Sequence, residues 1–230
     1  MTIAVIIPTL NESSTIARTV TRTVALAFDE IIVSDGGSTD PTVQMVQACC
    51  ARVPAVRLVT APTGRARQMN EGVKACCSEI VLFLHADTEL PLNAKTAIES
   101  TLTDPRIIGG RFDIRFDHPS RWGTVISWFM NRRSRLSGIA TGDQAMFVRR
   151  QVFERMGGFP DIPLMEDIEF SRRLKRQGPV AALTDQVTTS FRRWEKNGPL
   201  RTILLMWTVR FLYWLGVSPT RLTHFYGTIR

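Results

Sequence analysis

Short apolar runs alternate with longer amphipathic segments along the first half of the chain. The apolar runs cover residues 2–8, 30–34, 56–60 and 79–84. Apolar runs of this length that give way to helical spacing predict a parallel α/β sheet. In such a sheet, ligands bind beyond the carboxyl ends of the strands. Three of the runs end in polar residues that include a carboxylate, so we expect these groups to share one binding crevice.

Helical spacing follows most of the runs, with residues that are typical of helix starts. Four helices are expected: one capped by Asn11 or Ser13 and ending near Leu26, one opened by Asp40 and Pro41, one over 65–75 after Gly64, and one from Asn93 to about Leu102. Asp and Asn are favoured caps, and Pro suits the first turn.

The pattern changes near Pro105. Residues 107–116 alternate, so that Phe112 and Ile114 face away from Arg111 and Asp113, which predicts a half-exposed strand. Further elements are expected at 120–134 (helix), 145–149 (strand), 166–177 (helix, with an i,i+4 pair between Glu169 and Arg173) and 199–217 (apolar helix). We expect a single domain over 1–230, with a nucleotide-binding half at 1–104, an acceptor half at 105–198 and a helical extension at 199–230.

Composition and charge narrow the class of partner. The chain has 230 residues, 44% of them hydrophobic, a net charge of +8 and a pI near 10.0. These values exclude a disordered chain and favour an anionic partner, such as a nucleotide-linked substrate, nucleic acid or an anionic membrane. The four cysteines form two adjacent pairs without zinc-site spacing, which suits a reducing compartment. The chain enters a strand directly after Met1, so we expect no signal peptide and a cytoplasmic location.

The carboxylates at the strand ends suggest a nucleotide site with a metal ion. Asp35 precedes two glycines, but the spacing of a dinucleotide or P-loop motif is missing. Its carboxylate could accept a hydrogen bond from uracil or ribose, or form an Asx-type turn. Asp87 ends the most hydrophobic run and is a plausible oxygen ligand for Mn²⁺ or Mg²⁺ held mostly by a diphosphate. His85 is more simply a packed or hydrogen-bonded residue than a ligand.

Four ordered motifs carry a family resemblance. They are 6–12 (IIPTLNE), 33–40 (VSDGGSTD), 84–88 (LHADT) and 165–170 (MEDIEF). In this order they resemble the signatures of family 2 glycosyltransferases, which implies a GT-A fold with a Rossmann-like, mostly parallel central sheet flanked by helices. The short length and the run 157–160 (GGFP) resemble the radical-SAM/selenodomain-associated transferases within that family.

The resemblance implies an inverting transfer of a sugar from a nucleotide-diphosphate donor, with UDP expected, to an acceptor hydroxyl. It assigns the nucleotide pocket to Pro8, Thr9, Glu12, Asp35, Arg65, Ala86 and Asp87, with the metal on Asp87. It assigns the catalytic base to Asp167, with Glu166 as its competitor. Acceptor and diphosphate contacts fall to Gly142, Asp143, Arg193 and Trp194.

Two departures from the family pattern matter. The usual Asp-x-Asp metal motif reads His85-Ala86-Asp87, which weakens the expectation of metal dependence. The Gln-x-x-Arg-Trp motif of processive members keeps only Arg193 and Trp194, so a single transfer is expected.

Two other classes stay open. A nucleotidyltransferase would also use a metal-held diphosphate, but it normally needs a second carboxylate. A nucleic-acid binder would explain the basic clusters at 132–135 and 172–176, although neither belongs to a recognised base-reading module.

The apolar helix predicted at 199–217 bears on the identity of the acceptor. Its uninterrupted apolar run is too short to span a bilayer. It could lie on a membrane as a peripheral helix, which would suit a lipid-linked acceptor rather than a small molecule. The simpler expectation is that it is buried against the domain or a homodimer partner.

Overall fold

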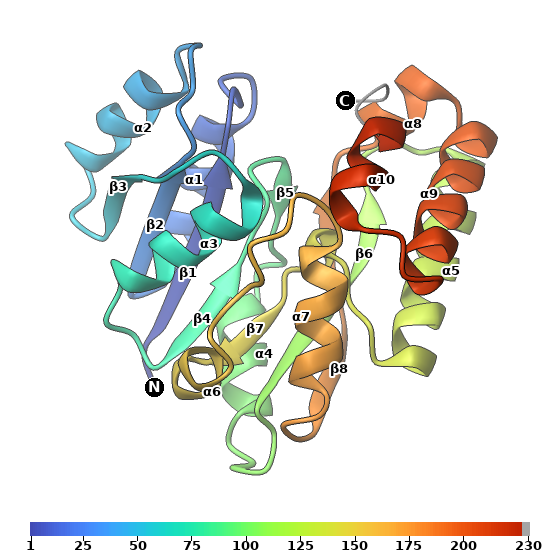
Figure 1. The fold of residues 1–230 in the computed structure, drawn as a ribbon. Helices are drawn as coiled ribbons and strands as arrows, with labels where there is room; N and C mark the ends of the chain where they lie inside the picture. Colours follow the sequence, from blue (N-terminus) through green and yellow to red (C-terminus); the bar gives the residue numbers. More distant parts are fainter. Residues whose placement is uncertain (227–230) are drawn as a thin grey trace.

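The computed structural model of the protein describes residues 1–226. In this part of the chain, strands form one sheet with helices on both faces (Figure 1). The strands are β1 (Ile3–Thr9), β2 (Glu30–Asp35), β3 (Val56–Thr60), β4 (Ile80–Phe83), β5 (Thr88–Glu89), β6 (Gly109–Phe116), β7 (Phe147–Arg149) and β8 (Val180–Thr189).

The sheet order is β3-β2-β1-β4-β7-β6-β8-β5. Strands β1 to β4 pair in parallel, and so do β6 and β8, whereas β7 runs antiparallel to β4 and β6, and β5 runs antiparallel to β8. The predicted α/β fold with a mostly parallel sheet is therefore confirmed. Of the antiparallel strands, β7 lies in the second half, where the pattern changed, and β5 lies in the first half.

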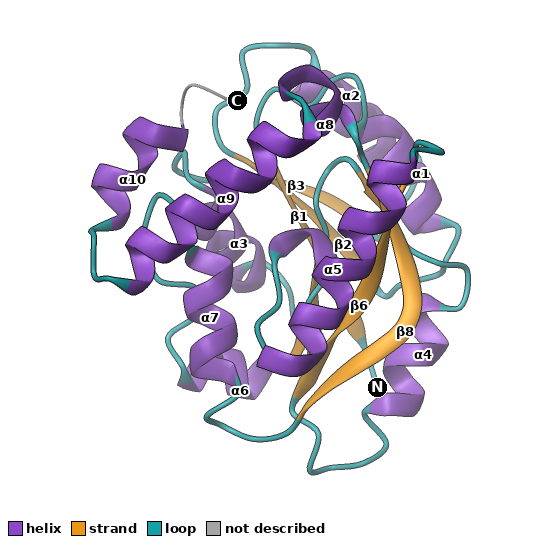
Figure 2. Ribbon diagram, turned by 90° about the vertical axis from the view of Figure 1, so that its right-hand side faces the viewer, coloured by secondary structure: helices purple, strands orange, loops and turns teal. Residues whose placement is uncertain are grey.

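The helices surround this sheet and continue beyond it (Figure 2). They are α1 (Ile16–Val24), α2 (Thr42–Cys50), α3 (Arg65–Lys74), α4 (Ala94–Thr101), α5 (Arg121–Ser137), the short 3-10 helix η1 (Gly142–Gln144), α6 (Arg150–Arg155), α7 (Glu166–Leu174), α8 (Arg192–Asn197), α9 (Pro199–Trp214) and α10 (Pro219–Tyr226). The expected caps differ: α1 begins after Thr15, and Asn11 instead accepts the backbone N–H of Thr39 at 2.8 Å, which joins two loops.

Alternation along β1 divides the core between the two faces. Ile3, Val5 and Ile7 pack with residues of α1, α2 and α4, whereas Ala4 and Ile6 pack with residues of α3, α6 and α7. Successive side chains of a strand point to opposite faces, so a strand covered on both faces must be apolar throughout. The unbroken apolar runs of the sequence follow from this arrangement.

The prediction of a half-exposed strand at 107–116 is wrong. Arg111 is only 3% exposed and Asp113 only 8%. Helix α5 covers this side of β6 and supplies Arg135, whose Nη2 lies 2.6 Å from Asp113 Oδ2, while Arg111 Nη1 lies 2.5 Å from Asp113 Oδ1. Buried charges occur when they are paired, so alternating charges here indicate an ion-pair network and not a solvated face.

Two further expectations are corrected. Arg173 does not pair with Glu169; it donates to the carbonyls of Met156 and Gly158, and Glu169 pairs with Arg172 at 3.3 Å. The apolar helix at 199–217 is present as α9 but is not buried against the domain, because only Thr202 and Val209 of α9 are buried. None of the helices within the described residues is both long enough and apolar enough to cross a bilayer.

Candidate active site

The carboxyl ends of β1, β2 and β4 lie side by side, as the sequence predicts. Thr9 is in register with Asp35, and the N–H of Leu84 donates to the carbonyl of Ile6 at 2.9 Å. The amide N–H groups of Gln68 in α3 donate to the carbonyl of Ser34 at 3.1 Å and to that of Thr9. These hydrogen bonds hold the ends of β1 and β2 together. These contacts place the predicted nucleotide residues along one edge of the sheet.

Asp35 forms the tight turn that follows β2. Its Oδ2 accepts the N–H groups of Gly37 and Ser38, both at 2.9 Å, and its Oδ1 accepts the Ser38 hydroxyl. Gly37 has φ +93, and a Cβ on Gly36 would lie 2.8 Å from the Gln68 amide, so both glycines are required. The Asx-type turn is thus present. A carboxylate has about four lone-pair sites, so one remains for a ligand.

Pro8 and Ala86 contribute backbone to this edge. Pro8 is a buried residue of β1, and the carbonyl of Ala86 accepts the Thr19 hydroxyl at 2.7 Å. Both residues are buried, and neither side chain offers a polar group to a ligand.

The carboxylates of Glu12 and Asp87 both lie near the guanidinium of Arg192. Arg192 of α8 places Nη2 3.5 Å from Glu12 and 3.7 Å from Asp87. Each carboxylate side chain retains about 30% exposure. Arg192 was not predicted as a site residue; its position beside the Arg193-Trp194 motif was the available signal.

His85 belongs to the loop that supports the acceptor side. Its Nδ1 lies 3.0 Å from Asp143 Oδ1, and its Nε2 is buried with no hydrogen-bond partner. A Cβ on Gly142 would lie 2.4 Å from this Nε2, so the ring packs tightly under the backbone of residue 142. The expectation that His85 is a packed residue is confirmed.

Asp143 is held ionised by its surroundings. Burial alone would raise the pKa of this carboxyl, but the hydrogen bond and charge of His85, with the charges of Arg193 and Arg65, hold its pKa well below the usual range. Arg193 and Asp143, which are distant in sequence, therefore face one another across the site. Trp194 packs edge-on against Phe116 with ring centroids 6.0 Å apart.

Asp167 and Glu166 begin α7 and point in different directions. Glu166 is 3% exposed and pairs with Arg65 Nη1 at 3.3 Å. Asp167 accepts the N–H of Gly142 at 2.9 Å through Oδ2 and its neighbour's N–H at 2.7 Å through Oδ1. Burial, together with the charge of Glu166, raises the pKa of Asp167 to about 6. The backbone N–H groups at the start of α7 favour the ionised form of Asp167, but burial and the charge of Glu166 outweigh them.

Arg133 is a second residue that the sequence did not single out. Burial lowers the pKa of its guanidinium, while the charges of Asp167 and Asp143 oppose that shift. Its Nε and Nη2 are buried and have no hydrogen-bond partner. Arg133 belongs to the basic cluster at 132–135, which the sequence suggests is exposed. In the fold, part of its guanidinium is buried near the charges of Asp167 and Asp143.

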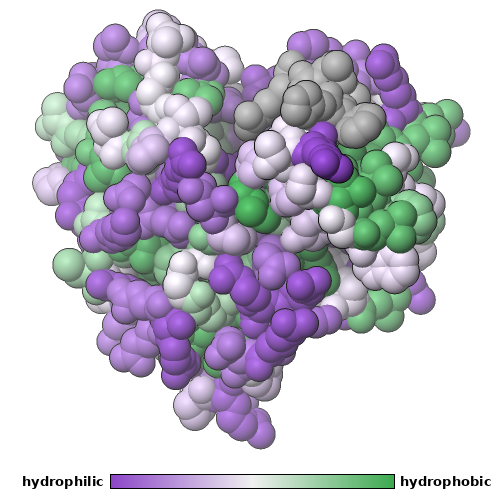
Figure 3. Space-filling view, viewed as in Figure 1, coloured by the Kyte–Doolittle hydropathy of each residue, from purple (hydrophilic) through white to green (hydrophobic). Residues whose placement is uncertain are grey.

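The space around these groups is open to solvent. Figure 3 shows the surface hollowed between the lobe formed by the first helices and the C-terminal helices. The strand ends come from the first half of the chain, and η1 and α8 come from the second half.

The mixed, mostly parallel sheet with helices on both faces is an α/β fold of the GT-A type. The chain belongs to glycosyl transferase family 2, because the model of that family matches residues 4–157, more than half of its length. A search of curated proteins gives no match.

Solved structures share the fold at low identity. A chain comprising residues 1–349 of TarS from S. aureus is 17% identical with a TM-score of 0.67, and the match covers 84% of this chain and 61% of that one. A TarS complex with UDP-GlcNAc is 18% identical at the same TM-score, covering 83% and 58%. The mannosyltransferase PcManGT from Pyrobaculum calidifontis, in complex with GDP-Man and Mn²⁺, is 24% identical with a TM-score of 0.64, covering 81% and 56%. The chain thus spans less than two thirds of each of these proteins.

Proposed function

We propose that the protein is an inverting glycosyltransferase that moves one sugar from a nucleotide-diphosphate donor to an acceptor hydroxyl. The single observation that carries this proposal is Asp167, a half-buried carboxylate anchored by the N–H of Gly142 beside the donor edge. Family membership and the fold shared with proteins solved with UDP-GlcNAc and GDP-Man support a nucleotide-sugar donor. The resemblance to the radical-SAM/selenodomain-associated subfamily remains a prediction.

Asp167 acts as the general base. It takes the proton of the acceptor hydroxyl as that oxygen attacks the anomeric carbon from the face opposite the leaving diphosphate. A base with a pKa near the working pH is effective, and the value of about 6 leaves Asp167 mostly ionised at neutral pH. Glu166 is less suitable, because its buried carboxylate is committed to Arg65.

The donor lies along the strand ends. Asp35 and Thr9 receive the nucleoside, with Glu12 and Arg65 at its sides, and Asp143, Arg193 and Trp194 line the diphosphate and acceptor region. UDP is the expected nucleotide, because the free lone pair of Asp35 suits the imide N–H of uracil. This assignment divides the chain into the nucleotide half, 1–104, and the acceptor half, 105–198.

A divalent cation fits Asp87 as its one protein carboxylate. Within the described residues, no three His, Cys, Asp or Glu side chains gather as a metal-binding group. His85 does not fit as a ligand, because Nδ1 faces Asp143 and Nε2 is packed against Gly142. Mn²⁺ or Mg²⁺ would therefore be held mainly by the diphosphate and would stabilise the charge of the leaving group. PcManGT was solved with Mn²⁺.

The two alternative classes lose support from specific contacts. A nucleotidyltransferase needs a second carboxylate for a two-metal clamp, and His85 stands in that place. The basic cluster at 172–176 is used internally: Arg172 pairs with Glu169, Arg173 donates to two carbonyls, and Lys175 donates to Ser137. These contacts tie the cluster into the fold, and the cluster, whose Arg172, Lys175 and Arg176 are exposed, belongs to no recognised base-reading module.

Thermal melting with a panel of nucleotide sugars, with and without Mn²⁺, tests the donor. A ligand at about 100 times its dissociation constant stabilises by roughly 2.7 kcal/mol, which is a clear rise in melting temperature. We expect UDP-sugars with Mn²⁺ to give the largest rise and to be hydrolysed slowly. If no nucleotide sugar shifts the melting temperature, the proposed function is wrong.

A further inference from the structure

The exposed hydrophobic surface of this protein is concentrated on two helices. Eleven of the fourteen large hydrophobic side chains that are exposed among the described residues belong to α5, to α9 or to Leu215 directly after α9. They include Trp128 (54% exposed) on α5 and Trp207 (68%) and Trp214 (79%) on α9. Both helices lie on one side of the molecule in Figures 1 and 2, and we call this surface the α5–α9 face. Contiguous apolar surface of this kind marks an interaction site.

The packing of helix α9 within this chain does not explain its apolar composition. Its contacts with the rest of the molecule rest on a small cluster around Met165, Val209 and Leu222. A helix that only covered the domain would keep its outer side polar. Figure 3 shows hydrophobic residues gathered at the right-hand edge, over the C-terminal helices.

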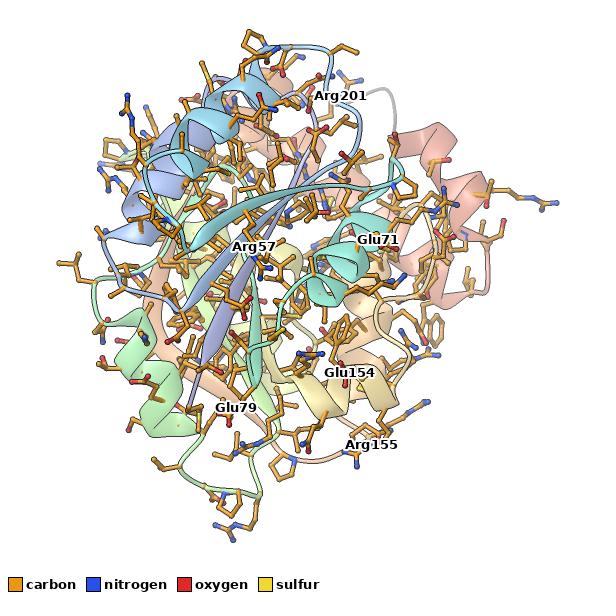
Figure 4. All side chains as sticks on the ribbon, turned by 90° about the vertical axis from the view of Figure 1, so that its left-hand side faces the viewer. Arg57, Glu71, Glu79, Glu154, Arg155 and Arg201 are labelled. Carbon is orange, nitrogen blue, oxygen red and sulfur yellow. The ribbon has the colours of Figure 1, made fainter. Side chains whose placement is uncertain are left out.

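The α5–α9 face also carries basic side chains and no acidic ones: Arg121, Arg132 and Arg201 are exposed on it, whereas the guanidinium of Arg133 is largely buried and Arg135 pairs with Asp113. Residues 121–137 and 199–215 contain six arginines and no Asp or Glu, in a chain whose net charge is +8. Arg132 lies over the ring of Trp128, 5.6 Å from its centroid. The opposite side, seen in Figure 4, carries Glu71, Glu79 and Glu154 among its arginines. Exposed arginines and exposed aromatic rings therefore occur together on this face.

This combination selects an anionic lipid bilayer over a second copy of the chain. A two-fold dimer brings the same patch against itself, which would set arginine against arginine with no carboxylate to pair. An anionic bilayer supplies phosphates for the arginines and an apolar layer for Trp and Phe. Arginine stems can lie along apolar surface while their charged ends reach the headgroups.

We propose that the α5–α9 face docks on an anionic membrane surface, with Trp128, Trp207 and Trp214 in the headgroup layer. A groove of about 470 Å³, lined by Trp128, Phe129, Leu136 and Arg133 among others, opens on this face. Arg133 at its inner side interacts electrostatically with Asp167. A lipid-linked acceptor would suit an enzyme docked in this way, a consequence that rests on the proposed function, whereas the docking does not.

Co-sedimentation with vesicles tests the docking without any need for turnover. The full chain is mixed with vesicles of phosphatidylcholine alone or with a quarter of phosphatidylglycerol, at low and at physiological salt. We expect binding to the anionic vesicles only, weakened by salt. The double variant Trp128→Gln/Trp207→Gln should bind more than about tenfold more weakly. The double variant Arg132→Gln/Arg201→Gln should lose about fivefold for each arginine.

Matched controls change equally exposed residues elsewhere. Met45→Gln/Leu92→Gln and Arg155→Gln/Arg176→Gln should bind like the parent. The melting shift with UDP and Mn²⁺, measured on every variant, separates a failure of docking from a failure of donor binding. Absence of binding to anionic vesicles at low salt would overturn the proposal, as would equal binding by all variants. A dimer in light scattering that dissociates on Trp207→Gln, without vesicle binding, would assign the face to a second copy.

Discussion

At the scale of single residues, Asp167 is the group on which the chemistry depends. Asp167→Asn keeps the shape of the side chain but removes its basicity, so turnover should fall by about 10²–10⁴-fold while UDP affinity stays near that of the parent. In the parent, kcat/KM should fall tenfold per pH unit below about 6, where Asp167 becomes protonated. Steady-state kinetics with Glu166→Gln as the comparison checks this. Near-normal turnover in Asp167→Asn, with Glu166→Gln inactive, would assign the general base to Glu166. Near-normal turnover in both variants would exclude both carboxylates as the base.

The raised pKa of Asp167 also predicts a change of stability with pH. Its pKa in the folded protein is about 6, against 3.8 for an ordinary Asp, so the folded state holds the proton more tightly than the unfolded state. The stability from this group is complete below pH 3.8 and is lost as pH rises through 6. Asp167→Asn should therefore gain stability relative to the parent between pH 4.5 and pH 7.5. Urea unfolding at both pH values measures this, and an unchanged difference would contradict the shift.

Asp87 is the residue that should connect metal to donor. Asp87→Ala should weaken UDP binding in Mn²⁺ at least about tenfold, or 1.4 kcal/mol, with a much smaller loss in chelator. The reason is that only the metal-bound state uses this oxygen as a ligand. Glu89→Ala, which removes a nearby carboxylate paired with Arg18 and Arg22, is the control. Titration calorimetry showing equal losses in both conditions would exclude a metal role for Asp87.

At the scale of elements, the 142–143 loop joins the two halves of the site. A Cβ on Gly142 would meet the buried Nε2 of His85 at 2.4 Å, so Gly142→Ala should cost about 1–3 kcal/mol of stability by overpacking. It should also slow turnover, because the N–H that anchors Asp167 must move. Gly123→Ala, whose Cβ meets ordinary contacts at 3.6 Å within α5, should be neutral or stabilising. A double-mutant cycle with His85→Ala should show recovery, and strict additivity would argue against the clash.

The elements also show what a single sequence can and cannot predict. The edge formed by Thr9, Asp35 and Asp87 follows from strand ends, because parallel strands deliver their last residues to one place. The role of β6 does not follow, because Arg111 and Asp113 alternate like surface residues until Arg135 of α5 covers them. Arg133 and Arg192 were missed for the same reason: their partners lie far away in sequence, and only the packing of α5 and α8 brings them to the site.

At the scale of the whole molecule, stability should be uneven. Strands β1, β2 and β4 are buried on both faces, whereas α9 and α10 rest on a small cluster. Local opening requires less free energy where few apolar contacts are lost. Native-state hydrogen exchange should therefore show amides of β1 and β4 exchanging only by global unfolding, and those of α9 exchanging well before them. Equal protection throughout would mean that the C-terminal helices unfold together with the sheet.

The bridge from Arg192 to Glu12 and Asp87 has a consequence for the order in which ligands arrive. Two uncompensated carboxylates would repel an incoming diphosphate, but a guanidinium already lies between them. The guanidinium offsets one of these two negative charges, so the repulsion of an incoming diphosphate is weakened before any metal ion binds. A cation on Asp87 would compete with this guanidinium and leave it free to contact the phosphates. Ligand binding at the strand ends would then be an exchange of counter-ions that acts on α8, the helix that leads into α9.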